Sequence, residues 1–282
     1  MRRFRSIFLL LSVSWGAHAQ IASTNQSEIL LHSLFNRLYT AKNDAHRQVI
    51  NDSICKEFTQ AFSQPASFNY AFDSLQYVGK VYSTDHELRI YSWNYITQSG
   101  NYHFECFIQR KQDDAVFRLK QPMSVYLPQK QGKISPDNWY GALYYSAIPY
   151  KYQKRTVYLL LGWSRYSESR NFKMIDVLSF ENNKISLGEP IFHVNGSILS
   201  RITIPYTSRY SLTLQYDRKD KMIIFNHLHI LSVNDESTAI PDENFSAYLV
   251  TKTGLKFKEE LQLKDKHISH TRSHYKAPDS VK

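Results

Sequence analysis

Two stretches near the start of the chain repeat apolar residues at helical spacing. A period of about 3.6 residues over 27–41 and again after residue 43 predicts two amphipathic helices. Asn43 or Asp44 can cap the second helix, and Pro65 ends it. The pattern therefore predicts an αα-hairpin within residues 20–66. The apolar positions are Leu30, Leu31, Leu34, Phe35, Leu38 and Tyr39 in the first helix and Val49, Ile50, Ile54, Phe58 and Ala61 in the second.

From about Leu75 onward, short runs of aromatic and branched residues alternate with polar turns. Such alternation is typical of antiparallel strands. The runs predict an α+β chain that is predominantly antiparallel β, with a meander of roughly nine to twelve strands after the helices. The clearest runs are 88–94, 102–110, 115–120, 140–149, 156–163, 172–180, 191–194, 198–204, 212–216 and 222–230.

Three turns pair neighbouring strands into predicted hairpins. Residues 97–101 join 88–94, which is apolar on both faces and therefore central, to 102–110. Residues 181–184 (Glu-Asn-Asn-Lys) form a second turn, and residues 217–220 (Asp-Arg-Lys-Asp) form the third.

The β-rich region is expected to span residues 67–265. Residues 121–138 are polar and contain three prolines, so they form a connecting loop and a possible sub-domain boundary. The apolar period is lost near the end, and 266–282 are expected to be a disordered basic tail. Because no constant repeat is visible, an incomplete β-propeller is the alternative to a meander of packed sheets.

The first residues carry the features of a secretory signal. Positive charge at residues 2–5 precedes an apolar run over 7–13, and residues 17–19 (Ala-His-Ala) match the small-x-small cleavage pattern. We expect removal of residues 1–19, with cleavage before Gln20. The apolar run is too short to span a bilayer, and we expect no transmembrane span in the mature chain.

Composition adds a basic balance and many aromatic rings. The 282 residues carry a formal net charge of +10, and removal of the predicted signal with its three arginines leaves +7. This charge favours an anionic envelope component or a glycan as partner, although dispersed charge also simply maintains solubility. We expect no nucleic acid partner and no cofactor.

The two cysteines, Cys55 and Cys106, allow two interpretations. Export permits a disulfide between them. Both fall on apolar faces of predicted elements, so two buried free thiols are the alternative.

Several segments in a fixed order together resemble a family of exported, uncharacterised proteins of Bacteroidota. This resemblance covers most of the chain after the helical hairpin and implies export, a β-rich fold and a location in a Gram-negative envelope: periplasm, outer-membrane face or outside the cell. The family has no established activity, so the resemblance assigns no functional residue. Asn226 stands where the family's FDHL motif has Asp. The segments are FDSLQYVGKVYSTDHELRIYSWN (72–94), YHFECFIQR (102–110), AIPYKYQKRTVYLLLGW (147–163), KMIDVLSF (173–180) and LQYDRKDKMIIFNHL (214–228).

Few residues form patterns that carry chemistry. His227 and His229 are two apart in a predicted strand, so they share a face and could hold a metal if a third ligand were near. Asp176 lies within an apolar strand, where it must pair with an arginine such as Arg155 or Arg201 or serve in catalysis. The sequence lacks the nucleophile elbow of serine hydrolases, the glycine-rich phosphate loop and the HExxH motif of zinc proteases.

The sequence leaves three hypotheses for function. The first is an exported, non-enzymatic envelope protein that binds or scaffolds. The second is a glycan-binding module whose exposed rings follow the polar loop, namely Trp139, Tyr140, Tyr144 and Tyr145. The third is an enzyme of unrecognised class.

Overall fold

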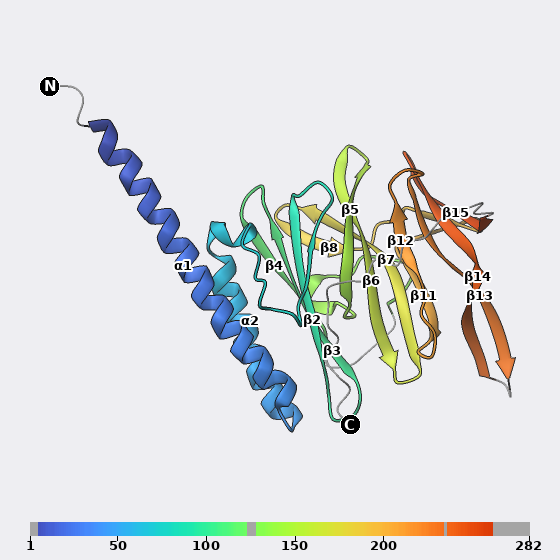
Figure 1. Ribbon diagram of the computed structural model, residues 1–282. Helices are drawn as coiled ribbons and strands as arrows, with labels where there is room; N and C mark the ends of the chain where they lie inside the picture. The colour runs from blue at the N-terminus through green and yellow to red at the C-terminus, as the bar shows by residue number, and fades with distance from the viewer. Residues whose placement is uncertain (1–4, 123–127, 234–235, 262–282) are drawn as a thin grey trace. The chain divides into compact units, whose positions relative to one another are not determined.

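The computed structural model describes residues 5–122, 128–233 and 236–261, with two helices followed by fifteen strands (Figure 1). The α+β class is therefore confirmed. The described chain divides into two compact units. The smaller holds residues up to Val78 together with 109–116, and the larger holds 79–108 and the chain from Phe117 onward.

The smaller unit is built on the predicted helical hairpin. Helix α1 spans Arg5–Thr40 and helix α2 spans Asp44–Phe62, followed by a short 3₁₀ helix, Pro65–Phe68. Asn43 caps α2, since its side chain accepts a hydrogen bond of 2.8 Å from the backbone N–H of His46. Helix α1 begins well before residue 27, because an amphipathic stripe marks only the part of a helix that packs against a partner.

Aromatic rings fill the space between these helices and the segment that follows them. Phe58 lies 6.3 Å from Phe35 and 5.1 Å from Phe62, measured between ring centroids. The carboxylate of Glu28 accepts hydrogen bonds from the Tyr70 hydroxyl and the Ser74 backbone N–H, each 2.7 Å long. The segment after α2 is thus held by both apolar burial and a buried carboxylate.

The first sheet, most of whose residues belong to the larger unit, is a meander in the order β1-β2-β3-β4. Its strands are β1 Gly79–Tyr82, β2 Leu88–Ile96, β3 Tyr102–Arg110 and β4 Ala115–Lys120. Strand β2 is buried along both faces, as its apolar pattern predicted. Residues 128–138 lead into the second sheet and include a 3₁₀ turn, Pro136–Asn138.

The second sheet has the order β11-β7-β6-β5, with β8 also paired to β7. The Asn182 and Asn183 backbones have φ of 47° and 63°, the left-handed values that a two-residue hairpin turn requires, so the predicted turn is confirmed. The strands are β5 Leu143–Tyr152, β6 Arg155–Ser167, β7 Arg170–Glu181, β8 Lys184–Leu187 and β11 Ile202–Thr207.

The third sheet has the order β10-β9-β15-β14-β13-β12 and is antiparallel except where β15 pairs with β9. Strands β14 and β15 escaped prediction because polar residues and Pro241 interrupt their alternation. The main paths of the three sheets in the described chain have four, four and six strands, with β8 added to the second sheet. Strands β1–β4, β5–β8 and β12–β15 each pair in chain order, so the propeller alternative stays a prediction. The strands are β9 Phe192–Val194, β10 Ser197–Leu199, β12 Leu214–Asp217, β13 Met222–Val233, β14 Glu236–Thr251 and β15 Gly254–Leu261.

The main core of the larger unit lies between the second and third sheets. Side chains from the inner faces of both sheets meet there, including Leu159 and Ile175 from the second and Ile223, Phe225 and Tyr248 from the third. This arrangement is a sandwich of two sheets around one apolar layer.

A buried ion pair lies on the opposite face of the second sheet. Asp176 and Arg201 are both completely buried, with Arg201 Nε 3.2 Å from Asp176 Oδ2. The other guanidinium nitrogens donate to the carbonyl oxygens of Gln129, Gly132 and Leu187. One charged pair therefore joins β7 to the connecting loop and to the end of β8.

Gly188 makes room for that guanidinium. Its φ is +100°, and a Cβ atom there would lie 2.3 Å from Arg201 Nη2. Any other residue would meet both backbone strain and a clash.

In the ranges that the structure describes, no helix is long and apolar enough to cross a membrane. The predicted tail, 266–282, lies outside those ranges.

Arg201→Met should lower the free energy of unfolding by about 3–5 kcal/mol, because it leaves the Asp176 carboxylate buried without its cation. Urea denaturation measures this change. The double variant Asp176→Asn/Arg201→Met should lose less than Arg201→Met alone, since it buries no charge. A single variant within about 1 kcal/mol of the wild type would contradict a supporting role for the pair.

Candidate functional site

The aromatic residues predicted to be exposed for glycan binding are core residues. Trp139 is 0% exposed and Tyr140 and Tyr144 are almost as deeply buried. Trp139 Nε1 donates to the Tyr144 hydroxyl at 3.0 Å, and the Tyr140 hydroxyl donates to Asp176 Oδ2 at 2.7 Å. The prediction of exposure was wrong because buried hydrogen bonds satisfy the polar atoms of these rings. With those atoms bonded, the rings can be buried. Tyr145 is partly buried and donates to the carbonyl oxygen of Leu214.

The two cysteines form no disulfide. Cys55 and Cys106 are both free and buried, so of the two interpretations the structure has the buried thiols. Burial raises the pKa of the Cys106 thiol well above its ordinary value, and a nearby carboxylate, Glu105, adds to the effect.

His227 and His229 lie together, as their spacing predicted, with ring centroids 5.6 Å apart. They have different partners: His227 Nδ1 is 3.2 Å from Ser246 Oγ, and His229 Nε2 is 2.8 Å from Asp242 Oδ2. Within the described ranges, no group of three or more histidines, cysteines or acids is arranged to hold a metal ion. The structure therefore provides no support for the metal hypothesis.

Two acids within largely apolar strands, Asp176 and Glu105, are both paired. Asp176 pairs with Arg201 rather than Arg155, and its Oδ1 accepts a 2.7 Å hydrogen bond from the Val177 N–H. Burial raises the Asp176 pKa, and the charge of Arg201 partly opposes this. Burial also raises the pKa of Glu105, but hydrogen bonds from His103 and a bidentate Arg118 outweigh it, so the net shift is downward. This bonding gives both carboxylates a structural role.

A different group of residues stands out at the inner face of the second sheet, near the end where β6 turns into β7. Lys173 of β7 lies between Trp163 of β6 and Ile204 of β11 in the strand register. Its Nζ is 4.4 Å from the centre of the Tyr145 ring. A lysine thus points to the edge of the apolar core and rests on an aromatic face.

The ammonium of Lys173 lacks an anionic partner. Desolvation by burial is the single cause that lowers its pKa, to about 8, and no carboxylate within the described ranges pairs with it. Shifted pKa values of this kind occur at structural as well as functional positions.

A polar atom near Lys173 also lacks a hydrogen-bond partner in the described chain. Asn171 is two residues away on the same face and only 8% exposed, and its Oδ1 has no hydrogen-bond partner in the described part of the chain. Burial raises the pKa of Tyr206, and side-chain hydrogen bonding with Trp163 and Asn171 opposes this. We call Tyr145, Trp163, Asn171, Lys173 and Tyr206 the inner cluster.

The same end of the sheet carries exposed aromatic and basic residues. Register places Ser167, Arg170 and Thr207 on one line across three strands. Tyr166 and Tyr210 adjoin this line and are 37% and 49% exposed. We call Tyr166, Arg170, Arg209 and Tyr210 the outer tip.

Hydrogen bonds hold the backbone of the outer tip. The N–H of Ser208 donates to the carbonyl oxygen of Ser169 at 2.9 Å. Arg165 donates to the carbonyl oxygens of Ser167 and Glu168 and stacks over the Tyr102 ring, 5.1 Å from its centre. The exposed rings are therefore presented on an ordered backbone.

This end of the sheet gathers several kinds of group that can contact a ligand. It offers aromatic faces, guanidinium and ammonium groups and an unused amide acceptor, which together suit a ligand with negative charge, hydroxyl groups and flat apolar faces. Sequence reasoning missed it, although one signal was present: Lys173 shares a strand face with the apolar Ile175 and Val177.

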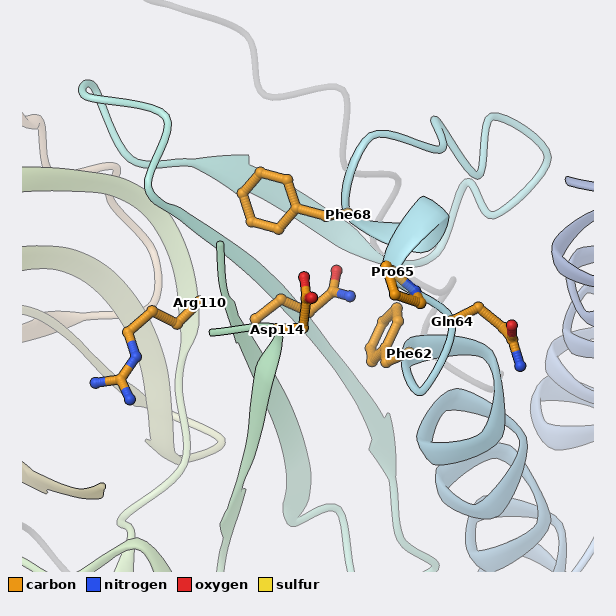
Figure 2. Close-up of a pocket in the computed structure, with 7 residues that line it drawn as sticks. Phe62, Gln64, Pro65, Phe68, Arg110 and Asp114 are labelled. Carbon is orange, nitrogen blue, oxygen red and sulfur yellow. The ribbon is translucent and has the colours of Figure 1, made fainter. Parts of the chain in front are cut away.

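The smaller unit contains a shallow hollow of about 180 Å³, a figure that includes space open to solvent. Figure 2 shows side chains that come from the end of α2, the short helix after it, the end of β3 and the turn that follows β3. The lining residues are Phe62, Gln64, Pro65, Phe68, Gln109, Arg110 and Asp114.

Comparison with family models, with curated proteins and with solved structures gives no match to this chain.

Lys173→Met should raise the free energy of unfolding at pH 7 by about 2 kcal/mol. Removing the desolvated charge gains up to about 3 kcal/mol, and losing its contact with Tyr145 costs about 1. The lowered pKa of Lys173 also predicts that the stability of the wild-type protein depends on pH. Because the folded pKa lies below the unfolded one, wild-type stability should rise between about pH 8 and 10.5.

Urea denaturation at pH 7, 8, 9 and 10 compares the two proteins. The variant should lack the part of the rise that comes from Lys173. Equal slopes in both proteins would show that this amine has an ordinary pKa.

Proposed function

We propose that the protein is an exported, non-enzymatic component of the cell envelope that binds an acidic polysaccharide through the outer tip and the inner cluster. The observation that carries this proposal is the meeting of exposed tyrosines, arginines and an uncompensated lysine at one end of the second sheet. Each feature is common alone, but together they match one class of ligand.

The exposed rings supply the contacts for sugar. Tyr166 and Tyr210 each present an apolar face with a polar edge, a combination that stacks on pyranose rings and hydrogen-bonds their hydroxyl groups. The ordered turn beneath them limits the entropy lost on binding.

The arginines supply the preference for negative charge. Arg170 and Arg209 are exposed and form no ion pair in the part of the chain that the structure describes. One acid, Glu168, lies on the hairpin between Arg165 and Arg170. The local field is therefore positive and attracts a polyanion.

Export rests on the sequence of residues 1–19. A basic start, a short apolar run and a small-x-small end predict a cleaved signal. An envelope protein encounters acidic polysaccharides at the cell surface, so the expected location and the proposed ligand are consistent.

Binding of polygalacturonate to the purified protein tests the proposal. We expect calorimetric binding that weakens with added salt, and none to neutral dextran. Tyr210→Ala and Arg209→Ala should each weaken affinity about fivefold, equivalent to about 1 kcal/mol.

Two matched variants serve as controls. Ile198→Ala removes an apolar side chain with the same 49% exposure as Tyr210, and Arg218→Ala removes an exposed arginine from the β12–β13 turn. Both should bind like the wild type. Equal losses in all four variants, or wild-type binding of dextran as tight as that of polygalacturonate, would refute the proposed surface.

The mature N-terminus tests export. Expression of the full chain in a Gram-negative host should yield periplasmic protein that begins at Gln20. Ala19→Arg should block cleavage, because signal peptidase requires a small residue at that position. Cytoplasmic protein with an intact Met1 would contradict export.

A further inference from the structure

Strands β13 and β14 continue beyond their neighbours in the third sheet as a pair. On one side β12 pairs with β13 only as far as Phe225, and on the other side β15 pairs with β14 only from Phe245 onward. Past these points, residues 228–233 pair with 236–241 and with no other strand within the described ranges. We call residues 228–233 and 236–244 the arm. Each of its two strands therefore has one edge that no strand of the described chain covers.

The β14 edge of the arm carries features that oppose the addition of a strand. Pro241 has no N–H to donate, and Glu236, Asp242 and Glu243 bring three negative charges. Proline and charged side chains are the usual means by which natural sheets protect an edge. A further strand is therefore disfavoured on this side.

The β13 edge of the arm has no such protection. Residues 223–233 contain no proline, lysine, arginine, aspartate or glutamate. Leu228 packs against the main core, and Ile230, two residues further along the same strand face, is 71% exposed. An extended, uncharged and apolar edge is a template on which another strand can pair.

The strand register shows which backbone groups of β13 face outward. Residues of an antiparallel pair alternate between positions that exchange hydrogen bonds and positions that do not. Proline fits without loss only at a position of the second kind, and Pro241 lies opposite Leu228. By alternation, Leu228, Ile230 and Ser232 direct their N–H and C=O groups away from β14.

We propose that two copies of this chain associate by antiparallel pairing of their β13 edges, with Ile230 of one copy opposite Ile230 of the other. The outward groups of Leu228, Ile230 and Ser232 are symmetric about Ile230, so a two-fold axis there bonds all of them in both copies. The two exposed isoleucine side chains then cover each other on one face of the joined sheet. This inference does not depend on the proposed polysaccharide-binding surface.

Charge favours an identical strand as the occupant of this edge. An acidic or basic strand would gain no ion pair along residues 223–233, whereas a second β13 matches them in apolar pattern and adds no repulsion. The acids of the two β14 strands lie on the outer sides of the joined sheet, about 14 Å apart at a strand spacing of about 4.8 Å. This separation exceeds the Debye length of about 8 Å at physiological salt, so their repulsion is screened.

A dimer held by one strand from each copy should be weak. Its interface is smaller than the roughly 1,200–2,000 Å² of stable complexes, so we expect a dissociation constant of about 10–100 μM. Sedimentation velocity of the purified protein between about 1 and 300 μM should show a monomer that converts to a dimer. A monomer throughout this range would overturn the proposal.

Ile230→Lys should weaken the dimer about tenfold or more, because the two-fold axis places the new charge opposite its own copy. Ile198→Lys is the matched control, since Ile198 is 49% exposed on β10, another edge strand, and this variant should dimerise like the wild type. Both variants should keep the wild-type thermal unfolding midpoint, because both side chains are exposed. Equal dimerisation of wild type and Ile230→Lys would overturn the proposed edge.

Ile230→Cys tests the register in an otherwise unchanged chain. Residues opposite each other in a hydrogen-bonded antiparallel pair have Cα atoms about 5.5 Å apart, which suits a disulfide. Oxidation with glutathione disulfide should therefore link two copies of Ile230→Cys. Cys55 and Cys106 are buried and should not react.

His229→Cys is the register control. In the proposed pairing, residue 229 of one copy lies about 8 Å from residue 229 of the other, too far for a disulfide. It should therefore remain largely unlinked under the same oxidation. Equal yields of linked dimer from the two variants would overturn the register, and absence of linked dimer from Ile230→Cys would overturn the pairing itself.

Discussion

The fully buried pair of Asp176 and Arg201 is the constraint on which the second sheet and its surroundings depend. Two opposite charges in the interior are tolerable only when every donor and acceptor is bonded. Here the guanidinium reaches the loop after β4 and the end of β8, while the carboxylate also accepts from Tyr140. The requirement to satisfy this pair therefore draws the loop, the sheet and the Trp139 network into one arrangement, with Gly188 leaving the necessary space.

Strand β7 carries two charged side chains whose environments differ. Asp176 and Lys173 are three residues apart, so they leave opposite faces of the strand. On one face the charge is satisfied inside the protein and supports the fold. On the other face Lys173 meets aromatic rings and no carboxylate of the described chain. Desolvation is partly opposed by Arg201 at Asp176, whereas at Lys173 it is the single cause of the pKa shift.

The outer tip and the inner cluster combine order with unused bonding capacity. Arg165 donates hydrogen bonds to the carbonyl oxygens of Ser167 and Glu168 and so stabilises the hairpin. Arg170 and Arg209, in contrast, form no ion pair in the described ranges. Ligand binding at such a surface would need little rearrangement, because hydrogen bonds already hold the backbone. Its positive charge agrees with the basic balance of the whole chain.

The sequence by itself determined the helical hairpin and most of the extended segments, though not β14 and β15, and it required a partner for the buried charge of Asp176. The Asn43 cap, the Asn182-Asn183 turn and an arginine partner for Asp176 all follow from local propensity or from the cost of a buried charge. Tertiary structure alone decided which arginine pairs with Asp176, that Trp139 is buried, and that Lys173, Asn171 and Tyr206 meet near the outer tip. These outcomes depend on the register between β6, β7 and β11 and on how two sheets pack. Alternation along one strand shows which residues share a face of the sheet, but it does not show which residues of other elements contact that face.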